Sequence, residues 1–74
     1  MADITAADAR TLTLAYLRDL MSKLPAAWRT APQIQFDFKS YSIPDMIAQV
    51  EMNTAVGIRY VSYHTKAAGN IIVG

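Results

Sequence analysis

The residues that could carry acid, base or metal chemistry are few and far apart in the sequence. His64 is the only histidine and there is no cysteine, so a transition-metal site would lack the nitrogen and sulfur ligands that these ions prefer. Asp37, Asp45 and Glu51 form no evident acid/base pair, and Asp45 is better placed to cap a helix. We therefore expect His64 to be a surface histidine, and we expect no enzymatic activity, no metal and no cofactor.

The residues that could bind phosphate or nucleic acid are equally sparse. Glycine occurs only at positions 57, 69 and 74, so no glycine-rich phosphate loop can form. Trp28 beside Arg29 would suit base stacking next to a phosphate contact, but we favour a tryptophan that covers the end of a small core. A net charge of +1 is too small for the positive field of an autonomous nucleic-acid binder. DNA is therefore not expected to be the main partner.

The size and composition of the chain predict one small domain. Its 74 residues are 53% hydrophobic, which is enough for a compact core but not for a deep cleft. The acidic N-terminal segment does not resemble a signal peptide, and no apolar run approaches the roughly 20 residues of a membrane span. The lack of cysteine suits a reducing cytoplasm. We expect no membrane partner.

The first element predicted is a helix from about residue 5 to residue 23. Thr5 can cap its N-terminus, with Asp8 three residues later in the first turn. Pro25 should end the helix, because it disfavours helical geometry for Leu24. Its apolar positions follow three- and four-residue spacing: Leu14, Leu17, Leu20, Met21 and Leu24.

The next segment changes to a period of two, which predicts a strand. Ile34, Phe36 and Phe38 alternate with polar residues over positions 34–39. Because a lone strand leaves its backbone groups unpaired, we expect residues 27–30 to fold back as its partner through Ala31 and Pro32. The result would be a two-stranded antiparallel hairpin.

A second amphipathic helix is predicted over residues 43–61. Ser42 and Asp45 mark its start, and Pro44 lies in the first turn, where a missing N–H costs nothing. Gly57 either ends the helix or weakens it by about 1 kcal/mol. The expected buried stripe comprises Ile43, Met46, Ile47, Val50, Thr54, Gly57, Ile58 and Val61. Met52 lies off this stripe and is a candidate contact residue.

These elements predict an α+β fold in the order helix, two-stranded antiparallel hairpin, helix, followed by an extended C-terminal tail. We expect a single domain over residues 1–74, with a core over about residues 5–61 and a tail over about residues 62–74. The two helices should pack antiparallel over one face of the sheet. The expected core comprises Leu17, Leu20, Phe36, Phe38, Ile47 and Val50. The apolar tail residues Ile71, Ile72 and Val73 should be buried, either against this domain or in a partner.

Four segments of the chain, taken in order, match a known pattern: the helix over residues 7–22, the strand over 34–40, the second helix and the apolar tail. The most specific part is the run from Ile47 to Thr54. With these segments the chain resembles, over nearly its whole length, the gpW family of head-tail joining proteins of tailed bacteriophages. In the run the family shows Ile-Ala, an acid or amide, an apolar residue, Glu, an apolar residue, an amide and Thr.

The resemblance implies a structural virion protein at the head-tail junction, present in the host cytoplasm during assembly. Such a protein binds the portal protein as a dodecameric ring of identical copies, helps retain packaged DNA, and offers a docking surface to the next connector, stopper or tail protein. Non-specific contact with the packaged DNA would accompany that position. The second helix and the tail would reach the portal, which assigns the partner interface to Met52, Arg59, Tyr60, Tyr63, His64, Lys66, Ile71, Ile72 and Val73.

Two other classes of function remain open from the residues themselves. One is a small host α+β DNA-binding regulator, which the near-neutral charge disfavours. The other is a minor enzyme or toxin, which the missing catalytic constellation disfavours. Salt-dependent binding of duplex DNA by the isolated protein would favour the regulator.

Overall fold

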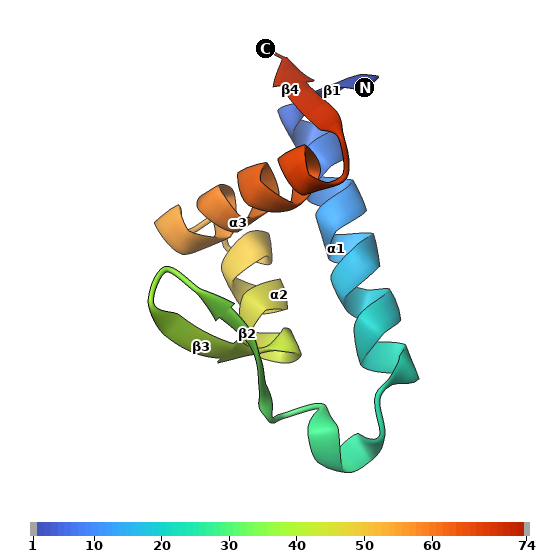
Figure 1. Ribbon diagram of the computed structural model, residues 1–74, viewed down its shortest axis with the longest axis vertical. Helices are drawn as coiled ribbons and strands as arrows, with labels where there is room; N and C mark the ends of the chain where they lie inside the picture. Colours follow the sequence, from blue (N-terminus) through green and yellow to red (C-terminus); the bar gives the residue numbers. More distant parts are fainter. Residues whose placement is uncertain (1, 74) are drawn as a thin grey trace.

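The computed structural model describes residues 2–73 and has the mixed helix and strand content of an α+β fold, as predicted. The elements in chain order are β1 (Ala2–Thr5), α1 (Ala6–Lys23), a 3-10 turn η1 (Ala26–Trp28), β2 (Pro32–Phe36), β3 (Lys39–Ser42), α2 (Ile43–Glu51), α3 (Ala55–Ala67) and β4 (Asn70–Val73). Figure 1 shows α1 and α2 running in opposite directions, α3 crossing the end of α2, and both termini at one end. Residues 1 and 74 of the predicted domain lie outside the described residues.

Both ends of α1 follow the prediction. The Thr5 hydroxyl accepts a hydrogen bond from the Asp8 backbone N–H at 3.1 Å, which satisfies one of the free donors of the first turn. Leu24 adopts an extended conformation directly before Pro25, as the proline ring requires. The boundaries of this helix therefore depend on residues that are neighbours in the sequence.

The single helix predicted over residues 43–61 is wrong: the chain forms two helices, α2 and α3, separated by residues 52–54. Asn53 takes a left-handed conformation (φ 56°) that ends α2. Thr54 then starts α3, because its hydroxyl accepts from the Gly57 N–H at 3.1 Å. The Thr54 N–H and hydroxyl also donate to Gln49, to its carbonyl oxygen at 3.1 Å and to its Oε1 at 2.6 Å. These bonds fix the turn between the helices.

Gly57 neither ends a helix nor acts as a passive weak point. It is buried inside α3, and a Cβ atom at this position would lie 2.1 Å from the Gln49 carbonyl oxygen. Only a residue without a side chain allows the first turn of α3 to approach the last turn of α2 this closely. The glycine is therefore a packing requirement.

A hairpin is present, but its two strands begin five residues further along the chain than predicted, at Pro32 and Lys39. Residues 34–39 do not form one strand, because Asp37 and Phe38 make the turn between β2 and β3 with φ values of 52° and 63°. Residues 27–30 contribute to η1 and the loop after it, and Trp28 is exposed there instead of covering the core. Alternation of polar and apolar residues continued through the turn, so periodicity could not locate it.

The core is built mainly by the helices. Its buried members are Ala9, Leu14, Leu17, Ile43, Met46, Ile47, Val50, Tyr60 and Val61. Of the six predicted core residues, Leu17, Ile47 and Val50 are buried, and Leu20 and Phe36 are half-buried against the core. The sixth, Phe38, is fully exposed at the hairpin turn, so its assignment to the core is wrong.

The predicted tail is partly helix and partly strand. α3 continues to Ala67, and β4 pairs in parallel with β1, so that Ile4 lies opposite Ile72. These two isoleucines are half-buried and pack against the core, whereas Ile71 and Val73 point to the exposed face. The chain therefore covers one apolar tail residue with its own domain and leaves two accessible.

Candidate partner-binding surface

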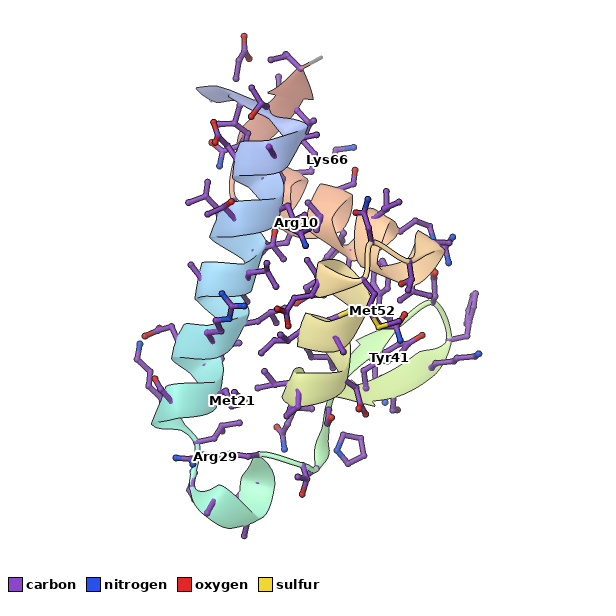
Figure 2. All side chains as sticks on the ribbon, turned by 180° about the vertical axis from the view of Figure 1, so that it is seen from behind. Arg10, Met21, Arg29, Tyr41, Met52 and Lys66 are labelled. Carbon is purple, nitrogen blue, oxygen red and sulfur yellow. The ribbon has the colours of Figure 1, made fainter. Side chains whose placement is uncertain are left out.

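Three of the predicted interface residues form a row on the outer side of α3. Arg59, Tyr63 and Lys66 are all exposed and spaced by four and three residues, which places them on one helix face. Lys66 lies in the last turn of the helix, where Figure 2 shows it pointing outward. We call these three residues the α3 row. They present two cations and one phenol to the surroundings.

Arg59 is held by the hairpin. Its Nε and Nη2 atoms both contact Asp37 Oδ2, at 2.7 and 2.5 Å. Both side chains are partly exposed, so the pair contributes about 0 to 1 kcal/mol to stability. Its main consequence is geometric, because it ties the turn between β2 and β3 to α3.

Tyr60 lies in the core instead of on the surface. Only 7% of it is exposed, and its ring meets Phe36 edge-on with centroids 5.4 Å apart. Burial raises the pKa of the Tyr60 hydroxyl, and the phenols of Tyr16 and Tyr63 raise it further. This residue therefore packs the hairpin onto α3 and is removed from the predicted interface.

His64 is likewise a contact between helices. Thr13 Oγ1 donates its proton to the Ala9 carbonyl at 2.8 Å, so its 3.1 Å contact with His64 Nδ1 requires the imidazole to donate. The ring also stacks on Tyr16, with centroids 4.6 Å apart. Burial lowers the pKa of His64, which favours the neutral ring. The expected surface histidine is instead half-buried between α1 and α3.

An open hollow of about 440 Å³ lies between the start of α1, the α2–α3 turn, α3 and β4. It is lined by Ala6, Arg10, Asn53, Ile58, Val61, Ser62 and Ile72. We call it the apolar hollow, because aliphatic side chains make up most of its wall. Arg10, labelled in Figure 2, donates from Nη2 to the Glu51 carbonyl at 2.8 Å and from Nε to the Val50 carbonyl at 3.2 Å. These bonds satisfy carbonyl groups at the end of α2.

The nine predicted interface residues do not form one patch. The α3 row occupies one face, Met52 is 72% exposed at the α2–α3 turn, and Ile71 and Val73 lie on the outer face of β4. Tyr60, His64 and Ile72 face inward. The helical spacing predicted that Ile58 is buried, but its side chain is exposed. It lines the apolar hollow, which the sequence analysis did not predict.

The part of the chain that the structure describes contains no group of three or more histidine, aspartate or glutamate side chains able to hold a metal ion. Among residues 2–73, no helix has the length and hydropathy required to cross a membrane.

No family model, curated protein or solved structure matches the chain. The resemblance to the gpW family accordingly stays a prediction based on the residues quoted for it.

Proposed function

We propose that this chain is a structural adaptor at the head-tail junction of a tailed bacteriophage. In this role it binds the portal protein as a ring of identical copies, helps retain packaged DNA, and presents a docking surface to the next connector, stopper or tail protein. The observation that carries the proposal is the order of α1, the β2–β3 hairpin and α2, with the run 47–54 at the end of α2. This is the order that the resemblance implies.

The residues of that run have roles within the fold. Glu51 Oε2 accepts from Arg18 at 3.2 Å, Asn53 provides the left-handed turn, and Thr54 caps α3. Gln49 supplies the two acceptors that hold Thr54. Residues 47–54 therefore support the proposal because they build the fold. Contact with a partner must be made by other residues, those exposed at the surface.

The exposed residues suit a protein partner. Met52, Ile71 and Val73 are large apolar side chains in contact with solvent, and the α3 row adds polar groups. Apolar and polar side chains of these kinds make up the centres and rims of protein interfaces, and methionine and arginine are enriched there. The portal is the partner proposed for β4 and the α3 row.

The test uses the phage whose genome carries this gene. Disrupting the gene should leave filled heads that lose their DNA or fail to accept tails, and the wild-type chain should restore infectivity. The double variant Ile71→Ser/Val73→Ser should fold, because both side chains are on the outer face of β4, but it should not restore infectivity. Trp28→Ser, which removes an exposed apolar side chain elsewhere, is the matched control and should restore it. Location of the gene away from any portal or capsid gene, or full activity of the double variant, would contradict the proposal.

A DNA-binding regulator is the second candidate, and one observation favours it. α2 and α3 are joined by a three-residue turn and cross one another, as in DNA-binding helix pairs (Figure 1). Against it, the α3 row holds only two cations, and Arg59 is already paired with Asp37. Duplex binding by the purified chain that weakens steeply with salt would favour the regulator over the adaptor.

A further inference from the structure

Phe38 occupies a position that its own domain does not explain. Its φ of 63° lies in the left-handed region, where a bulky side chain is an outlier. Two-residue hairpin turns with positive φ at both positions are normally formed by asparagine, aspartate and glycine. The ring gains nothing in exchange, because its exposure is 109% of the reference value. An exposed aromatic on a strained backbone points to a contact outside the domain.

The backbone that carries this ring is anchored on both sides of the turn to α3. Asp37, directly before Phe38, is bonded to Arg59 of α3, and Phe36 packs against Tyr60 and Tyr63 on the same helix. A backbone that is already fixed loses less conformational entropy on binding. We call the exposed Phe38 ring on this anchored turn the knob.

The apolar hollow offers a socket of matching chemistry on a different part of the chain. The side chains of Ile58, Val61 and Ile72 form an aliphatic wall, and a volume of about 440 Å³ accommodates one aromatic ring. Arg10 lies at the same site with its guanidinium group held against the end of α2. A fixed guanidinium group is a favourable neighbour for the face of an aromatic ring.

We propose that Phe38 of one copy inserts into the apolar hollow of a second copy of this chain. Knob and hollow belong to different elements, so the contact is head-to-tail: each pair retains one free knob and one free hollow. Repetition of such a contact produces a closed ring or an open chain. The proposal deepens the proposed function, on which it rests for its biological setting, by naming the contact between neighbouring adaptors.

The area of the contact predicts weak association of the free protein. One aromatic side chain buries about 150 to 250 Å², whereas stable interfaces bury at least about 1,000 Å² in total. The free chain should therefore be monomeric at micromolar concentration and should associate at about 0.1 to 5 mM. Binding of copies to a common partner would raise their effective concentration and favour the contact.

The first experiment measures amide chemical shifts of the purified protein from about 0.05 to 5 mM. The amides of Ile58 and Ile72 and of the hairpin turn should shift together with concentration. Phe38→Gly, which suits the left-handed backbone, should weaken this association at least about tenfold. Ile58→Glu should do the same by placing a charge in the hollow. Trp28→Ala, the matched exposed aromatic, should leave it unchanged.

The second experiment mixes the two defective variants. Labelled Phe38→Gly has an intact hollow and unlabelled Ile58→Glu has an intact knob, so the mixture should form a one-to-one heterodimer and nothing larger. If Ile58→Glu fails to fold, Ala6→Glu blocks the same hollow from the first turn of α1, where an acid is favourable.

Three outcomes would overturn the inference: no concentration-dependent shifts in the wild-type chain, shifts that survive Phe38→Gly, or no recovery in the mixture. Both experiments use the purified chain alone. Failure here would therefore leave the binding of the portal untouched, and failure of the infectivity test would leave this contact standing.

Discussion

Asn53, after α2, and Phe38, in the turn after β2, are two of the three non-glycine residues with positive φ in the described part of the chain, and their surroundings differ. Asn53 ends α2 within a network in which Thr54, Gln49 and Arg10 satisfy the neighbouring backbone groups. Phe38, at the hairpin turn, is bulky and fully exposed. Asparagine tolerates this conformation, whereas phenylalanine does so only at a cost in free energy.

Asn53 and its hydrogen-bonded neighbours help to determine the fold, whereas the fold does not need the Phe38 ring. Replacing the residues that pack or cap where α2 meets α3 should destabilise the domain, because these residues hold the two helices together. Replacement of Phe38 should stabilise it, because only strain is removed.

The largest effect is expected in the core. Met46 in α2 is completely buried, so Met46→Ala should lower the free energy of unfolding by about 2 to 5 kcal/mol by leaving a cavity. Met52→Ala, in the exposed turn, should change it by less than about 0.5 kcal/mol. Chemical denaturation of both variants measures the difference. Equal stabilities would mean that the core is placed wrongly.

Gly57→Ala should come next. Its new Cβ would meet backbone atoms of Gln49 and Val50, so α3 must move, at a cost of about 2 to 3 kcal/mol despite the better helix propensity of alanine. Gly69→Ala has no atom within 4 Å and pays only for its φ of 84°, about 1 kcal/mol. Thermal unfolding should rank the two variants in that order; the reverse ranking would argue against close approach of α2 and α3.

Thr54→Ala removes the cap of α3 and should cost about 1 kcal/mol. Thr54→Ser keeps the hydroxyl and is the control. Amide hydrogen exchange should show faster exchange in the first turn of α3 for the alanine variant only. Unchanged exchange would indicate that Asn53, and not the cap, defines the start of α3.

Phe38→Gly should raise the free energy of unfolding by about 1 kcal/mol, the opposite sign to the changes above, because glycine adopts positive φ without steric cost. Phe38→Ala keeps a Cβ in the same backbone and should gain less. Denaturation midpoints compare the two. A loss of stability in Phe38→Gly would show that the ring makes contacts within its own domain.

The smallest effect concerns pH. The pKa of His64 is lowered from 6.5 in the folded chain by burial, so the unfolded chain binds a proton more readily. Stability is fully present above about pH 6.5 and declines as the pH falls from there through the folded pKa. His64→Gln should lose this part of the pH dependence. Parallel profiles for both proteins between pH 7 and pH 5 would exclude a contribution from His64.

The sequence predicted the fold class and much of the core, but only part of the candidate site. Caps and breaks involve residues three or four positions apart, so the limits of α1 and the start of α2 could be identified from Thr5, Pro25 and Ser42. The hairpin turn could not, because alternation passed through Asp37 and Phe38 without interruption. Its exposed aromatic ring was consequently assigned to the core.

What the sequence alone determined is local: where α1 begins and ends, where α2 begins, and that the last residues of the tail are apolar. The tertiary structure decided the contacts between distant residues. Arg10 reaches the end of α2 across 41 positions, Thr13 meets His64 across 51, and β4 pairs with β1 from the other end of the chain. Periodicity shows that a face is apolar but not which element covers it. That choice depends on how all the elements pack together, and it decides whether Tyr60, His64 and Ile72 serve the core or a partner.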